Sequence, residues 1–298
     1  MMKRCWIQGD NLFDILNYCL FSFILFIMIY PLYWVVIASI SDPSLVTIGR
    51  IWMYPQGINF MGFKTIFNYK QIWLGYTNSI IYMILGTSIN VIITLAAGYA
   101  LSRRDLVGRN FFMGMIVVTM FFSGGLIPTY LVVKGIGIEN TMWAMVLPNA
   151  VNAFLLILAR TFFTATIPKE LLESAMMDGC RNFRFFRSIA LPLSMPIIAV
   201  MTIFSAVGHW NSYLPSLLYL RDQEMYPLQL VLRNILILEA SDASIIDPLG
   251  NRNLDEKRKI AEQIKYGVIL VSTLPVLVLY PFLQRFFIKG VMVGSIKG

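Results

Sequence analysis

The sequence has few charged residues and almost no histidine, and both shortages exclude classes of protein. Only 13% of its 298 residues are charged, and 57% are hydrophobic; an average soluble domain is about 25% charged. The single histidine is His209, and the three cysteines (Cys5, Cys19 and Cys180) are far apart, with no Cys-x-x-Cys pair. A membrane enzyme would need a nucleophile–base pair or a metal-ligand set. The sequence supplies neither, so we expect no enzyme activity, no disulfide framework and no metal site.

The sequence also lacks the Gly-x-x-x-x-Gly-Lys-Ser/Thr loop that binds nucleotide phosphates. If the system uses ATP, then ATP and Mg²⁺ bind a separate chain, and we expect no cofactor on this one. The net charge of +8 could suggest nucleic acid. However, the charges lie at the ends of apolar runs, where anionic lipid and membrane topology favour them. We therefore expect a lipid membrane as partner and no nucleic acid.

Long apolar runs predict six transmembrane helices. The first run is too long for the apolar core of a signal peptide, so we interpret it as a retained span. Ser123-Gly124-Gly125 and Pro128 interrupt the third run; tight packing could explain such a break, but a water-filled translocation path is the sharper interpretation. The predicted spans are residues 18–40, 78–101, 111–133, 143–158, 192–220 and 266–283.

The distribution of Lys and Arg predicts the orientation of these spans. With both termini inside, the short inner segments carry nearly all of the net charge of +8, as the positive-inside rule requires. The fold class is therefore an all-α, polytopic membrane bundle with cytoplasmic N and C termini. We divide the chain into two parts. Residues 1–77 contain a tail, the first span and an extracytoplasmic connection whose aromatic side chains rest on the membrane surface. Residues 78–298 form the core. Residues 41–77 should contain short helical pieces, and residues 221–263 should form a longer polar loop.

A charged stretch lies between the fourth and fifth apolar runs, on the predicted cytoplasmic side. Pro168 suits the first position of a helix, and Glu170 follows near its partly positive N-terminus. Gly179 stands where a helix commonly ends in a left-handed residue, and residues 181–187 form a second short amphipathic piece. Two short helices with a glycine between them would make a rigid knob for a partner protein. The alternative is an ordinary solvated loop.

The order of residues in this stretch resembles the EAA loop of inner-membrane permease subunits of ATP-binding-cassette importers, in particular the MalG- or LplC-type subunits of the carbohydrate-uptake branch. Ser174 and Cys180 depart from the motif, but both are small. The resemblance implies a MetI/MalG-like permease fold, with a coupling loop at residues 166–190 that docks in a cleft on an ATPase. The matching residues are Glu173-x-Ala175-x-x-Asp178-Gly179, Phe183, Phe186, Ile189-x-Leu191-Pro192 and Pro196.

The resemblance also implies a function and partners. The chain would be a multi-pass permease subunit of an ATP-driven, binding-protein-dependent importer of oligosaccharides or glycan fragments in the bacterial plasma membrane. It would work with a second homologous permease, two ATPase subunits and an extracytoplasmic solute-binding protein. The implied ATPase-coupling residues are Glu170, Glu173, Ala175, Asp178 and Gly179, and the implied tail residues near the ATPase are Gly290, Gly294 and Lys297.

Polar, aromatic and glycine residues inside the apolar runs are candidates for a substrate path. A proton relay through His209 stays open, because an ionisable group inside a membrane is a functional candidate. No acidic residue interrupts a predicted span to partner it, so the favoured interpretation is a polar cluster that faces the sugar or bonds helices together. An ion-coupled secondary carrier or channel subunit is the alternative function, although it should show charged residues within spans or paired broken helices. The candidate path residues are Gly124, Gly125, His209, Trp210, Asn211 and Tyr213.

Overall fold

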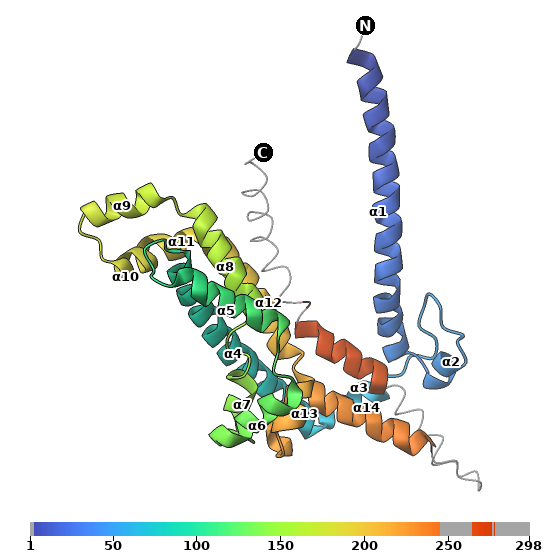
Figure 1. The fold of residues 1–298 in the computed structure, drawn as a ribbon. Coiled ribbons are helices and arrows are strands. Elements are labelled where there is room, and N and C mark those ends of the chain that lie inside the picture. Colours follow the sequence, from blue (N-terminus) through green and yellow to red (C-terminus); the bar gives the residue numbers. More distant parts are fainter. Residues whose placement is uncertain (1–2, 245–263, 276, 278–298) are drawn as a thin grey trace. The chain divides into compact units, whose positions relative to one another are not determined.

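The computed structural model describes residues 3–244, 264–275 and 277 (Figure 1). These residues are predominantly helical, and none of them forms a β-strand. The chain divides into two compact units: a first unit of residues 1–69 with 235–273, and a second unit of residues 70–234 with 274–298. The predicted all-helical class is confirmed.

The first unit contains the predicted first span. Helix α1 (Lys3–Ile40) holds an apolar stretch, Phe13–Ile40, that is long enough to cross a membrane. The connection after it contains the short helices α2 (Pro43–Thr47) and α3 (Met61–Asn68). A further helix, Ile264–Pro275, belongs to the predicted sixth span, and its Tyr266 meets the ring of Trp34 edge-on, with 5.3 Å between centroids.

The second unit is built around helix α4 (Lys70–Ser102), which is also long enough to cross a membrane. Helices α8 (Ala153–Thr166) and α12 (Met195–Trp210) pack along it. A Cβ atom added to Gly98 of α4 would lie 2.8 Å from the Cβ atom of Ala159, so the two backbones approach closely only because this residue is glycine. The predicted start of this span at residue 78 is wrong: α4 begins at Lys70, so residues 70–77 belong to the helix and not to the preceding connection.

The third predicted span is broken where its glycines predicted a break. Helices α5 (Arg109–Phe121) and α6 (Leu126–Ile136) meet at 115°. Gly125 at the junction has a positive φ of +85°, a backbone conformation that favours glycine. Among the described residues, two helices can cross a membrane alone, or up to four if each bent pair counts as one span. The predicted total of six spans stays a prediction.

The predicted fourth and fifth spans are wrong as continuous helices. Helix α7 (Met142–Val146) ends near Pro148, and α8 begins again at Ala153, where the side-chain oxygen of Asn152 accepts a hydrogen bond from Leu155 N at 3.1 Å. Proline cannot donate to a helix, and an amide cap favours a new start. The fifth span is likewise divided into α11 (Leu191–Leu193), α12 and α13 (Tyr213–Tyr219).

The loop predicted at residues 221–263 is also partly wrong, because it begins with helical structure. A 3₁₀ turn, η2 (Gln223–Met225), is followed by helix α14 (Leu228–Ser244). Leu228 N donates a hydrogen bond to Ser79 Oγ of α4 at 2.8 Å, and the side chains of Leu228 and Leu230 are buried. Packing against α4 therefore stabilises a helix in a stretch whose composition predicts a loop.

Candidate functional site

The charged stretch forms two short helices joined by a tight turn. Helix α9 (Lys169–Met177) is followed by α10 (Asn182–Phe185), a π-helical turn, η1 (Phe186–Ala190), and α11. Gly179 has φ +75°; its N–H donates to Met176 O at 3.0 Å, and Cys180 N donates to Ala175 O at 2.9 Å. This pair of bonds is the Schellman motif, which needs a left-handed residue at its centre. We call α9, the turn and α10 the elbow.

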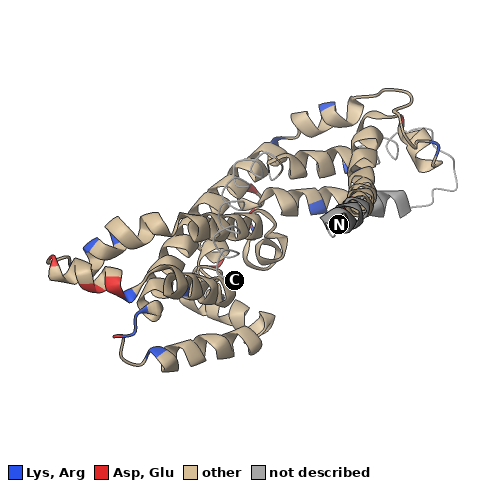
Figure 2. Ribbon diagram, turned by 90° about the horizontal axis from the view of Figure 1, so that it is seen from above, with Lys and Arg blue, Asp and Glu red and all other residues tan. Residues whose placement is uncertain are grey.

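One side of the elbow is acidic and open to solvent. The side chains of Glu170, Glu173 and Asp178 are all exposed, and Figure 2 shows acidic positions on α9. These are the carboxylates predicted to contact an ATPase. Because they stay on the surface, they are free to contact a protein that docks from outside.

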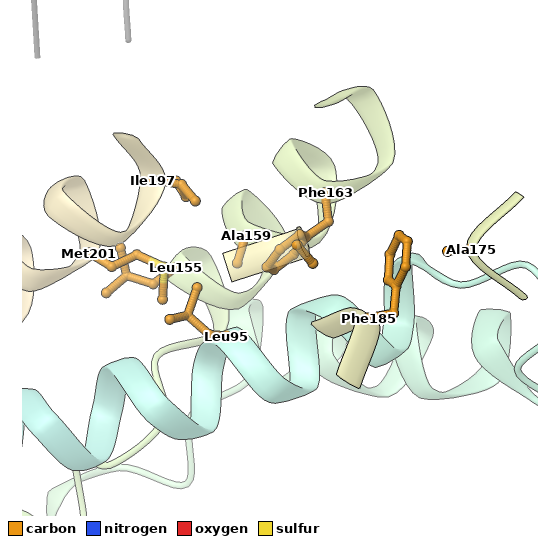
Figure 3. Close-up of a cluster of buried hydrophobic side chains, with 9 residues drawn as sticks. Leu95, Leu155, Ala159, Phe163, Ala175, Phe185, Ile197 and Met201 are labelled. Carbon is orange, nitrogen blue, oxygen red and sulfur yellow. The ribbon is translucent and has the colours of Figure 1, made fainter. Parts of the chain in front are cut away.

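The other side of the elbow is buried in the hydrophobic core of the second unit. Ala175 of α9 is 9% exposed and Phe185 of α10 is 1% exposed. Both belong to one buried cluster, the core cluster, which reaches helices α4, α8 and α12 (Figure 3). The elbow is thus packed against the spans, unlike an ordinary solvated loop. The core cluster consists of Leu95, Leu155, Ala159, Phe163, Ala175, Phe185, Ala190, Ile197 and Met201.

Arg103, in the short loop after α4, ties that helix to the elbow. Its guanidinium donates to Asn182 Oδ1 at 3.2 Å and to Tyr99 Oη at 3.3 Å, and it holds both carboxylate oxygens of Asp105 at 2.8 and 2.6 Å. The hydrogen bond with Asp105 raises the pKa of Arg103, and the guanidinium lowers the pKa of Asp105. The sequence alone does not predict this bridge, because Asn182 is distant from Arg103 in the chain.

A small pocket lies between α4, the α7–α8 connection, the start of α8 and α12; we call it the polar pocket after its amide and hydroxyl groups, although much of its lining is apolar. Its volume is about 270 Å³. Asn90 of α4 is 2% exposed; its amide nitrogen donates to Ala150 O at 3.1 Å, and its oxygen accepts from Ser205 Oγ at 2.7 Å. The lining residues are Asn90, Asn149, Val151, Asn152, Phe154, Leu155, Phe204, Ser205, Gly208 and His209.

His209 is the one predicted path residue in the lining of this pocket, and it also packs against Gly86 of α4. A Cβ atom added to Gly86 would lie 2.4 Å from the imidazole ring. Trp210 is buried instead against Tyr76, with 6.0 Å between ring centroids. Asn211 is the C-cap of α12, and Tyr213 begins α13.

The remaining predicted residues are placed elsewhere or not described. Gly124 and Gly125 lie at the α5–α6 junction, outside the pocket lining. Gly290, Gly294 and Lys297 lie outside the described residues. The asparagines and Ser205 of the pocket were missed by sequence reasoning, although Asn90, an amide inside an apolar run, was a usable signal.

Comparisons with known proteins show what this chain is similar to. Residues 92–238 match the family model "Binding-protein-dependent transport system inner membrane component". The polygalacturonan/rhamnogalacturonan transport system permease protein YtcP of Bacillus subtilis (strain 168) is 38% identical, over 97% of this chain and 99% of the relative. Protein LplC of the same organism is 38% identical, over 98% and 97%. A crystal structure of a bacterial ABC transporter involved in the import of the acidic polysaccharide alginate includes a chain with TM-score 0.81 and 29% identity, covering 94% of this chain and 98% of that one.

Proposed function

We propose that this chain takes part in the import of oligosaccharides or glycan fragments and is driven through its elbow by a separate ATPase. The premise is that the chain belongs to the family of binding-protein-dependent transport system inner membrane components. Family membership makes it a membrane-embedded ABC importer permease and not itself an enzyme. The carbohydrate class is supported by the relatives, whose names or titles include polygalacturonan/rhamnogalacturonan and alginate.

The observation that carries the coupling proposal is the continuity of the core cluster. Protein interiors are close-packed, so a buried side chain cannot shift without displacing its neighbours. A push on α9 therefore acts on Ala175 and Phe185, and through them on α4, α8 and α12. ATP binding would bring two ATPase subunits together, move the elbows of this chain and a second homologous permease, and open the cavity outward. Hydrolysis would reset it.

The shape of the elbow contributes more to docking than its charges. An exposed ion pair is worth about 0–1 kcal/mol, so Glu170 and Glu173 mainly orient the contact with a basic ATPase surface. Gly179 fixes the angle between α9 and α10, because its φ of +75° suits glycine and is unavailable to proline.

The test is co-purification with the ATPase subunit, combined with uptake of the substrate. Gly179→Pro should distort the elbow, and Glu173→Lys should reverse a charge on its exposed face, so both should weaken ATPase association and uptake. His209→Ala is the control for association, because His209 lies in the pocket and not in the elbow. Full association and uptake in both elbow variants would refute coupling through this site.

We further propose that the polar pocket contacts the carbohydrate. Its amides and hydroxyl can exchange hydrogen bonds with sugar hydroxyls, and Phe154 and Phe204 offer apolar faces to sugar rings. Asn149→Ala and His209→Ala should raise the KM for uptake of the oligosaccharide bound by the cognate binding protein, while ATPase association stays normal. An unchanged KM in both variants would exclude a substrate role for the pocket.

A further inference from the structure

The loop between α2 and α3, residues 48–60, folds back along the end of α1 (Figure 1). Its Ile51 side chain is buried against that helix, at 2% exposure. Three aromatic side chains of α1 donate hydrogen bonds to three successive carbonyl oxygens of the loop: Tyr30 Oη to Trp52 O at 3.4 Å, Tyr33 Oη to Met53 O at 2.6 Å, and Trp34 Nε1 to Ile51 O at 3.1 Å.

The positions of these donors fix the depth of the loop in the membrane. With a rise of about 1.5 Å per residue, Tyr30 lies about 15 Å and Trp34 about 9 Å before the helix end at Ile40. The apolar stretch Phe13–Ile40 contains 28 residues, whereas the hydrocarbon core needs only about 20. The loop therefore lies beside the part of α1 that passes from the hydrocarbon core into the headgroup layer.

The backbone hydrogen bonds suit this depth. A carbonyl group below the headgroups has no water to pair with, and an unsatisfied one is strongly unfavourable there. The carbonyl oxygens of residues 51–53 are satisfied by side chains of α1 instead. A loop surrounded by bulk water would not need three consecutive carbonyls to be paired in this way.

Beyond the buried Ile51, the side chains of Trp52, Met53 and Tyr54 are exposed, and they are apolar or amphipathic. Trp52 is 71% exposed, Met53 64% and Tyr54 66%, and Ile48 and Ile58 are similarly open. Trp and Tyr favour the membrane–water interface, where their rings meet both acyl chains and headgroups. Arg50, which is also exposed, places a positive charge where lipid phosphates would lie.

We propose that residues 48–58 form an interfacial anchor, with Trp52, Met53 and Tyr54 inserted into the lipid leaflet at the far end of α1 from the N-terminus. The occupant of this apolar surface is lipid, because the adjoining apolar span places the loop at the bilayer boundary. The anchor holds the end of α1 at a fixed depth, independently of any transported substrate.

A spin label at residue 53 tests the anchor. Met53→Cys is made with Cys5, Cys19 and Cys180 replaced by Ser, and the labelled protein, with its co-purifying subunits, is reconstituted in phosphatidylethanolamine/phosphatidylglycerol vesicles. Collision rates with oxygen, which concentrates in lipid, are compared with those of a water-soluble nickel chelate. Lys64→Cys, an exposed charged position on α3 of the same unit, is the matched control.

We expect the oxygen-to-nickel ratio at residue 53 to exceed that at residue 64 several-fold. A ratio equal to the control would place the loop in water and overturn the proposal. A label shielded from both reagents would show a protein partner on this surface and would overturn it as well. The measurement needs no uptake, so its result is independent of the transport proposal.

Discussion

Arg103→Ala should loosen the elbow, and the contacts of Arg103 indicate how much stabilising free energy is lost. The side chain is 10% exposed, whereas Asp105 is 65% exposed, so the ion pair itself contributes only about 0–1 kcal/mol. The hydrogen bond to Tyr99 is partly buried and the one to Asn182 is exposed, and hydrogen bonds to a charged group contribute about 1.5–3 kcal/mol. A total loss of about 2–3 kcal/mol would raise the population of the locally opened elbow roughly 30- to 150-fold.

Hydrogen exchange of the backbone amides of residues 178–185 measures this opening directly. In Arg103→Ala we expect faster exchange there, together with less substrate carried per ATP hydrolysed. The matched control is Arg104→Ala, since Arg104 is exposed and the structure records no hydrogen bond or ion pair between its side chain and any described residue. Equal exchange and equal transport in the two variants would refute the role of Arg103 as a positioning residue.

Three further outcomes follow from contacts in the second unit. Gly86→Ala should destabilise the protein by about 1–3 kcal/mol through overpacking against His209, and adding His209→Ala should recover most of the lost thermal stability. Ser205→Ala should leave the buried oxygen of Asn90 without its 2.7 Å donor, lowering the free energy of unfolding by about 1–3 kcal/mol in denaturation experiments. Because the pKa of Asp105 is lowered from 3.8, its ion pair should stabilise the loop above that pH and weaken only as the pH falls further. The stability difference from Asp105→Asn should therefore stay constant between pH 5 and 8.

The elbow could be predicted from sequence because its signals are local. Pro168 before the helix, Glu170 in its first turn and Gly179 after it each act within a few residues. The helix begins at Lys169, so Pro168 is its N-cap and not its first residue as predicted. Gly179 has the expected left-handed backbone. Local rules also predicted the break at Gly124-Gly125.

Two other features were missed: one although its signals are local, and one because its stabilising contacts join residues distant in the chain. Hydropathy alone predicted one continuous helix over residues 143–158, although Pro148 and the Asn152 cap divide this run into two helices. It treated the residues after Arg221 as a loop, because the helix there is stabilised by burial of Leu228 against α4. Composition reports the length of an apolar stretch, whereas backbone breaks and tertiary burial determine where its helices end.

The polar pocket shows the same limit at the candidate site. A single amide in an apolar run, such as Asn90, indicates a buried polar contact, but its partner Ser205 lies 115 residues away in the chain. Sequence reasoning therefore identified His209 in the right helix and missed the groups that line the pocket with it. The candidate pocket is lined by residues of α4, α8, α12 and the α7–α8 connection, so no single helix predicts it.

Side-chain hydrogen bonds join neighbouring elements at both ends of the second unit, and this favours its motion as a rigid body. At one end Arg103 joins α4 to the elbow. In the α6–α7 turn, Glu139 accepts hydrogen bonds from Tyr130 Oη and Arg221 Nη2, each at 2.8 Å, and so ties that turn to the residues after α13. A body held in this way cannot easily open its pocket by bending α4 alone. The pocket would instead gain and lose access as the whole unit turns against a second permease, because packed cores shift between discrete arrangements rather than deform continuously.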